Sequence, residues 1–156
     1  MKINTLIILG TMMFLMTSAR AIVPEGAKPE SISASSTTAI IHLNDAMFKE
    51  MVFDYEKNDK WKYEGNKPAI IDFYADWCAP CRQLAPVIED ISKEYSGKIV
   101  VYKVDTEKEK KLAQKIGITA LPTLIFIPVN GQPQVVMGAV PKSSLVKAIN
   151  DVLKVK

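Results

Sequence analysis

Two cysteines stand three positions apart in the sequence Cys78-Ala79-Pro80-Cys81, and they are the only cysteines of this 156-residue chain. A thiolate is a nucleophile and a disulfide partner, so the pair could exchange electrons with another disulfide. On a helix, residues three positions apart share a face, which brings the two sulfurs within reach of each other. We therefore expect thiol–disulfide chemistry here.

Other uses of a C-x-x-C pair fit this chain less well. Tetrahedral zinc needs four ligands, and the chain adds only one histidine, His42, far away in sequence. Covalent haem attachment needs a histidine directly after the second cysteine, where Arg82 stands. A purely structural disulfide is still open, although so small a loop removes little entropy from the unfolded chain. We expect no metal and no cofactor.

The pair lies where an apolar strand, 69–74, gives way to a helix, 80–95. The strand is apolar on both faces except at Asp72, which is typical of a buried central strand. Free N–H groups and positive potential at the start of a helix stabilise a thiolate. Cys78, outermost, should therefore be exposed with a lowered pKa, whereas Cys81, one turn further in, should be shielded.

Strand and helix patterns alternate along the rest of the chain and then end in a hairpin and a helix. The order is β-α-β-α-β-α-β-β-α, which predicts an α/β fold with a mixed sheet between helices. The first helix should be capped by Asn44, the third by a capping box of Thr106 and Glu109, and Asn130-Gly131 should form the hairpin turn. The remaining predicted strands are 39–43, 99–104, 123–128 and 134–137, and the remaining helices are 45–55, one ending at Gly117, and a last one that contains Leu145 and Leu153.

Four segments carry a resemblance to a known family. The sequence from Phe73 to Cys81, Phe-Tyr-Ala-Asp-Trp-Cys-Ala-Pro-Cys, resembles the active-site signature of the thioredoxin family. Residues 120–123 are similar to its cis-proline loop, Gly138-Ala139 to a glycine segment beside the substrate groove, and residues 40–43 to the opening strand of bacterial members. The resemblance covers residues 39–156 and implies a thioredoxin fold, with a central mixed β-sheet flanked by helices on both faces.

The resemblance implies a role for each matching residue. Cys78 attacks a client disulfide and Cys81 resolves the mixed disulfide that forms. Asp72 matches a buried acid beneath the second cysteine, and a carboxyl in an apolar strand does have a raised pKa and can accept a proton near neutral pH. Lys103 matches a lysine that tunes this acid, although the sequence is equally compatible with a solvated strand lysine.

The resemblance also implies which residues of this chain lie at the client-binding surface. Pro122 should be cis, Leu121 should offer its backbone to an extended client, and Trp77 should cover the site. Ala79, Pro80 and Gly138 should border the client. Ala79 replaces the family's usual Gly, and Leu121 its usual Ile. Residues 55–66 have no counterpart in minimal members, and they form either a partner surface or a solvated loop.

Pro80 favours a protein-disulfide reductase, because strong oxidants and isomerases of this fold typically carry His there, and His stabilises the thiolate. An oxidase or isomerase is the alternative. A non-catalytic peptide-binding module is a third reading, which the intact cysteine pair, Asp72 and Pro122 argue against.

The N-terminus has the pattern of a cleaved export signal. Lys2 precedes an uncharged apolar stretch, and Ala19-Arg20-Ala21 fits a cleavage site after Ala21. A retained membrane anchor is the alternative. We expect a signal peptide over 1–21, a flexible linker over 22–38, and the domain over 39–156 in the periplasm.

The compartment and the charge suggest the partners. Disulfide-containing exported proteins are the expected clients, and a membrane thiol transporter is the expected electron donor. The formal net charge of the whole chain is only +3, and no Lys/Arg stripe accompanies it, so nucleic-acid binding has little support. We expect a monomer.

Overall fold

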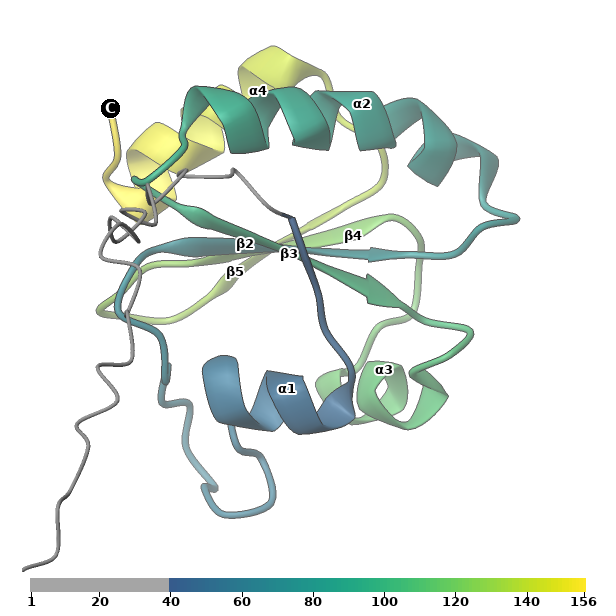
Figure 1. Cartoon of the computed structure of the whole chain (residues 1–156), viewed down its shortest axis with the longest axis vertical. Coiled ribbons are helices and arrows are strands. Elements are labelled where there is room, and N and C mark those ends of the chain that lie inside the picture. The colour runs from purple at the N-terminus through teal and green to yellow at the C-terminus, as the bar shows by residue number, and fades with distance from the viewer. Residues whose placement is uncertain (1–39) are drawn as a thin grey trace, which may run out of the picture. The chain divides into compact units, whose positions relative to one another are not determined.

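The computed structural model describes residues 40–156; the expected signal peptide over 1–21 and the whole of the expected linker over 22–38 lie outside the described residues. Five strands form one mixed sheet in the order β1-β3-β2-β4-β5 (Figure 1). β1, β3 and β2 run parallel, whereas β4 pairs antiparallel with β2, and β5 pairs antiparallel with β4. The strands are β1 (Ile41–His42), β2 (Ala69–Tyr74), β3 (Val100–Asp105), β4 (Thr123–Ile127) and β5 (Gln134–Met137).

Helices cover both faces of this sheet, which confirms the predicted α/β fold. α2 and α4 lie on one side, and α1 and α3 lie on the other (Figure 1). The helices are α1 (Asp45–Met51), α2 (Ala79–Glu94), α3 (Lys110–Ile116) and α4 (Lys142–Ala148), which continues into a π-helical turn, η1 (Ile149–Leu153). Because alternate side chains of each strand point to opposite faces of the sheet, the strands contribute to two separate cores, one on each face.

Each core lies between the sheet and one helix pair. Ile70 on β2 packs with Ile88 of α2 and Leu145 of α4, whereas its neighbour Ile71 packs with Leu112 of α3 on the opposite face. Burying a side chain of this size contributes about 1.5–3 kcal/mol. Since β2 is buried on both faces, its C-terminal end is held firmly, and that end leads directly to the cysteines.

The first helix is shorter than the sequence predicts. Asn44 caps it as expected, since its Oδ1 accepts a hydrogen bond from the Met47 N–H at 2.9 Å. The helix ends at Met51 instead of Tyr55 because Val52 is fully buried and Phe53 packs against Trp61, with ring centroids 5.0 Å apart and the rings tilted by 44°. Packing of these apolar side chains therefore ends the helix early.

The predicted capping box of the third helix is wrong. Thr106 Oγ1 donates to the Tyr74 carbonyl at 3.1 Å, and Glu109 Oε2 accepts the Asp45 N–H at 3.0 Å. Neither side chain caps α3, which begins at Lys110. Both polar groups satisfy backbone groups of other elements, so tertiary partners replace the local cap.

Residues 55–66 form an irregular segment between α1 and β2. Tyr55 donates a hydrogen bond to Asp45, and Tyr63 donates one to the Lys67 carbonyl at 2.8 Å. Trp61 and Tyr63 pack against the core under α1. The loop prediction is confirmed, but one side of this segment is packed on the domain and is not solvated.

Candidate active site

The end of β2 and the start of α2 place the two cysteines. The Cys78 N–H donates to the Ala75 carbonyl at 3.1 Å, which turns the chain sharply after the strand. Cys78 is then the N-cap of α2, and its Sγ accepts the Cys81 N–H at 3.2 Å. The two cysteines form a disulfide with their Cα atoms 5.3 Å apart. The structure therefore holds the site in its oxidised state.

The predicted exposure of Cys78 is wrong for this disulfide state. Cys78 is only 3% exposed and Cys81 is 5% exposed. The two cysteines cluster with Ala75, and Tyr74 and Leu121 pack against them. Bonding to Cys81 folds the Cys78 sulfur into this cluster, and neighbouring side chains shield it from water.

A groove next to the disulfide is nevertheless open to a client. It has a volume of about 510 Å³, and Cys78 lines it whereas Cys81 does not. Trp77 stands at its edge with 68% of its surface exposed, as expected for a side chain that covers the site instead of filling a core. Its other lining residues are Ala79, Pro80, Thr106, Glu107, Ala113, Ile118, Thr119, Ala120 and Leu121.

Several lining residues of the groove were not predicted from the sequence. Thr106 and Glu107 directly follow β3, the parallel neighbour of β2. The carboxyl ends of parallel strands meet at one edge of a sheet, so residues after β3 could have been placed beside the cysteines. Ile118 to Ala120 precede the cis-proline, and their closeness in sequence to Leu121 is the signal for them.

The cis-proline loop lies as the resemblance implies. The Leu121–Pro122 peptide bond is cis, and Pro122 is buried. The Gly138 N–H donates to the Pro122 carbonyl at 2.8 Å, with Gly138 at φ +86°, where a side chain would be strained. This bond joins the residue before β4 to the residue after β5, so Gly138 contacts the cis-proline loop but is not among the lining residues of the groove.

A buried acid and a lysine lie side by side in the sheet. Asp72 on β2 is in register with Lys103 on β3, and Lys103 Nζ is 3.6 Å from Asp72 Oδ2. The other carboxylate oxygen, Oδ1, is buried without a hydrogen-bond partner. Burial raises the pKa of Asp72 to about 6, and the Lys103 ammonium opposes this rise. Lys103 is thus a partner of the acid, not a freely solvated strand lysine.

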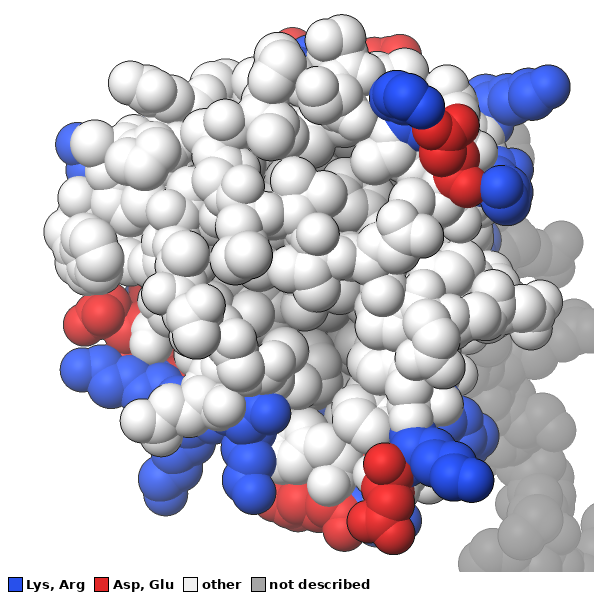
Figure 2. Space-filling model, turned by 180° about the vertical axis from the view of Figure 1, so that it is seen from behind, with Lys and Arg blue, Asp and Glu red and all other residues white. Residues whose placement is uncertain are grey.

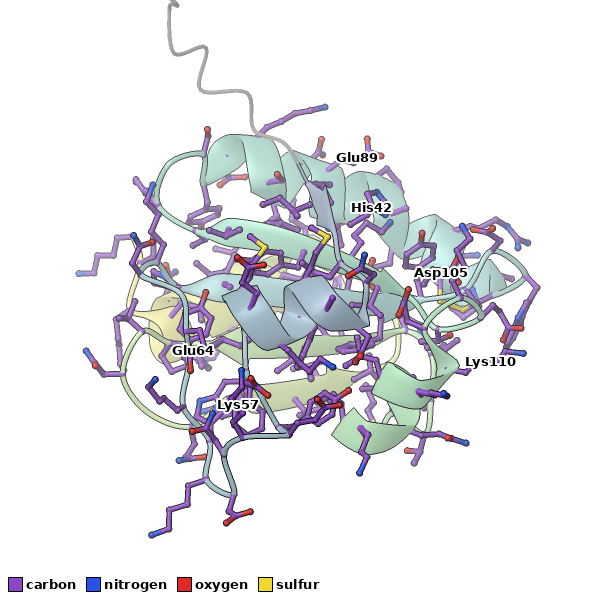
Figure 3. All side chains as sticks on the ribbon, turned by 60° about the horizontal axis from the view of Figure 1, so that its bottom comes forward. His42, Lys57, Glu64, Glu89, Asp105 and Lys110 are labelled. Atoms are coloured by element: carbon purple, nitrogen blue, oxygen red, sulfur yellow. A yellow bond between two sulfur atoms is a disulfide. The ribbon has the colours of Figure 1, made fainter. Side chains whose placement is uncertain are left out.

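Two aromatic neighbours of this lysine were not predicted. Lys103 Nζ lies 4.4 Å from the centroid of the Tyr74 ring, and the His42 ring meets Tyr74 edge-on at 6.4 Å. His42 is exposed on β1 and lines a surface hollow with Lys103 and Glu89 of α2. Figure 3 shows His42 and Glu89 on their elements, with the disulfide near the end of the sheet where Asp105 lies.

Residues 40–156 contain no group of three or more His, Cys, Asp or Glu side chains arranged to hold a metal ion. Within the same residues, no helix has both the length and the apolar character needed to cross a membrane.

A disulfide-forming cysteine pair at the start of a helix, packed against a cis-proline loop on a five-stranded mixed sheet whose central strand carries a buried acid, defines a thiol–disulfide oxidoreductase of the thioredoxin fold. The thioredoxin family model matches residues 39–151, and the chain belongs to that family.

Relatives of similar domain length support this assignment. A thioredoxin of Borreliella burgdorferi is 45% identical over 111 residues, which are 71% of this chain and 95% of that protein. A thioredoxin of Synechocystis is 37% identical over 116 residues, covering 74% of this chain and 99% of that protein. The crystal structure of chloroplastic thioredoxin z, 22% identical, has a TM-score of 0.62 and covers 74% of this chain and 96% of its own. It supports the fold.

Proposed function

We propose that this oxidoreductase reduces disulfides in exported proteins, with Cys78 as the attacking and Cys81 as the resolving cysteine. The observation that supports reduction of the client, and not its oxidation, is the N-cap of α2. The Cys78 sulfur accepts the Cys81 N–H, and the two side chains between the cysteines, Ala79 and Pro80, carry no charge. Without an imidazolium between the cysteines, the thiolate is stabilised only moderately, which favours the enzyme disulfide and makes the dithiol a reductant.

The reaction starts from the reduced enzyme. The Cys78 thiolate attacks one sulfur of a client disulfide, that S–S bond breaks, and the first client thiolate leaves. Cys81 then loses its proton and attacks the Cys78 sulfur of the mixed disulfide. The Cys78–Cys81 disulfide forms, the second client thiolate leaves, and two electrons have passed to the client. Because Cys78 lines the groove and Cys81 does not, only Cys78 faces an arriving disulfide.

Asp72 is the group that we assign to accept the Cys81 proton. Its pKa of about 6 keeps most of it ionised at neutral pH, while a pKa so near neutrality makes it a stronger base than an ordinary carboxylate. Its partnerless Oδ1 is available for that proton. Lys103 acts on the reaction through Asp72.

The compartment and electron donor rest on the N-terminal sequence. Lys2, the apolar stretch and Ala19-Arg20-Ala21 support export, and an exported reductase needs electrons from across the membrane. A membrane protein carrying a dithiol would supply them by the same exchange, reducing the Cys78–Cys81 disulfide.

Reduction of insulin disulfides by dithiothreitol tests the catalytic roles. The wild-type protein should accelerate the reaction, and C78S should abolish the acceleration. In a separate incubation without dithiothreitol, whose thiols would themselves cleave a mixed disulfide, reduced C81S should accumulate covalent client complexes on Cys78, because no Cys81 thiol is present to resolve them. Equal trapping by the two single variants would show that the attacking and resolving roles are assigned wrongly.

A further inference from the structure

The last strand of the sheet exposes an apolar surface along a free edge. β5 pairs only with β4, and β4 lies between β5 and β2. On β5, Val136 packs inward against the core, whereas Val135 is 57% exposed and Met137 is 63% exposed. Among the described residues, no other strand covers the outer main-chain groups of β5.

This edge also lacks the charges that normally protect one. The sequence contains no Lys, Arg, Asp, Glu or His between Lys115 and Lys142, a stretch that includes β4, the hairpin and β5. β1 lies nearest the viewer in Figure 1, so the opposite view in Figure 2 looks toward the β5 side. That face is broadly uncharged, with Lys, Arg, Asp and Glu confined to its rim. Lysine on an edge strand normally discourages pairing with another chain, and here that protection is missing.

The C-terminal end of the uncharged edge is hydrogen-bonded to the cis-proline loop of the redox site. Gly138 directly follows Met137 and donates its N–H to the carbonyl of Pro122, whose neighbour Leu121 lines the groove beside Cys78. A polypeptide lying along β5 is therefore led to the loop that borders the disulfide. The two surfaces can bind one client chain.

We propose that the free edge of β5 binds an extended, uncharged segment of the client by strand pairing, so that unfolded apolar segments are preferred substrates. This inference rests on the proposed reductase function and specifies its substrate class. Main-chain hydrogen bonds would give affinity, and Val135 and Met137 would select uncharged side chains. Two exposed side chains on a four-residue strand form a smaller patch than the roughly 800 Å² per partner of a stable protein interface. We therefore favour a short client segment over a second copy of this chain.

Peptides that differ only in their flank test the preference. Each carries one cysteine in a mixed disulfide with 5-thio-2-nitrobenzoate, whose release is coloured, next to a flank of Thr-Val-Gln-Val-Thr-Val or of Glu-Lys-Ser-Glu-Lys-Ser. Both flanks have zero net charge, and each is placed before the cysteine in one peptide and after it in another. We expect kcat/KM to be about tenfold higher for the uncharged flank in at least one of the two arrangements. N-methylation of alternate amides in that flank should remove the advantage.

Substitutions on β5 test whether the higher kcat/KM for the uncharged flank depends on this edge. V135K should lower kcat/KM for the uncharged flank to that of the charged flank and leave the charged-flank rate unchanged. N150K, which places the same charge at an exposed position of η1, should change neither rate. Thermal unfolding of both variants checks that the fold is retained, and V135T supplies a milder substitution if V135K does not fold.

Several outcomes would overturn the inference. Equal wild-type rates for the two flanks contradict the preference while leaving the proposed reductase function standing, whereas reduction of neither peptide contradicts that function itself. An equal effect of V135K on both peptides points to a structural role for Val135. A flank advantage that survives N-methylation rules out strand pairing. Concentration-dependent dimers in sedimentation that V135K abolishes would assign the edge to a second copy.

Discussion

Asp72 has the most unusual environment of any carboxyl group in the described chain. It is 1% exposed, one oxygen has no hydrogen-bond partner, and the other has only Lys103 at 3.6 Å. Burial disfavours its ionised form, and Lys103 compensates only in part, so its pKa rises to about 6. A buried carboxyl group with so few partners destabilises the folded protein, and this favours a chemical role for Asp72 over a structural one.

Replacing this acid should stabilise the oxidised protein in a pH-dependent way. Well below pH 4, Asp72 is protonated in both the folded and the unfolded chain. Between about pH 4 and pH 6 the unfolded chain is ionised at Asp72 while the folded chain is still mostly protonated, so the wild type loses stability across this window and the loss is complete above it. A pKa higher by about two, a rise that already includes the opposing effect of Lys103, corresponds to roughly 3 kcal/mol, so D72N should gain up to about 3 kcal/mol at pH 8. Urea unfolding of the wild type and D72N at pH 4 and pH 8 measures this difference in the free energy of unfolding.

The control is an exposed carboxyl near the same cysteines. D76N removes a charge at the surface and should change stability little at either pH. A gain for D72N that is as large at pH 4 as at pH 8 would show that burial of the ionised form is not its cause.

Lys103 should set the pH at which the mixed disulfide resolves. The rate should rise with pH as Asp72 ionises, with a midpoint near 6. K103M removes the charge that lowers the pKa of Asp72, so the midpoint should move upward. If the midpoint moves up by about one pH unit, the rate at a pH well below it should fall about tenfold. Rapid-quench kinetics of a preformed mixed disulfide on Cys78 follow this step.

A second lysine distinguishes a local effect from one of net charge. Lys108 pairs with Asp105 at 3.1 Å on the surface, and K108M should leave the midpoint unchanged. Similar changes of midpoint in both variants would remove Lys103 from its assigned role.

At the scale of elements, the N-terminus of α2 decides the redox character of the site. Cys78 caps the helix, and Pro80 occupies its second position, where a missing N–H costs nothing. Helix polarity thus acts on the sulfur without help from a charged side chain between the cysteines.

P80H should raise the reduction potential and shift the protein toward oxidase behaviour. Known values run from near −270 mV for thioredoxin to near −120 mV for a strong oxidant, and the wild type should lie toward the first. P80Q separates loss of proline from gain of an imidazole and should move the potential less. Equilibration against glutathione buffers measures the reduction potential of the wild type, P80H and P80Q. A wild-type reduction potential near that of the strong oxidant would contradict the reductase assignment but would not affect the assignment of the fold.

At the scale of the whole molecule, the export proposal concerns residues outside the described range. We expect the mature chain to begin at Ile22, because the apolar stretch ends at the small residues of Ala19-Arg20-Ala21. N-terminal sequencing of the protein purified from cell fractions tests this. A21R should block cleavage, whereas a wild-type chain that still begins at Met1 would contradict the proposal.

The sequence by itself determined the fold class, the redox pair and the buried acid. These were predictable because each depends on residues close together in the chain: an apolar strand interrupted by Asp72, then two cysteines where a helix starts. The cis-proline and Gly138 came from the resemblance, and the structure joins them by one hydrogen bond.

Tertiary structure decided everything that depends on contacts between distant elements. Thr106 and Glu109 have the pattern of a local cap, but β2 and α1 offer them better partners. The burial of Cys78 follows from packing against Leu121, and the Asp72–Lys103 pairing follows from the register of β2 on β3. The free edge of β5 likewise depends on strand order, which sequence periodicity cannot specify, because periodicity reports which face is buried and not which strand is the neighbour.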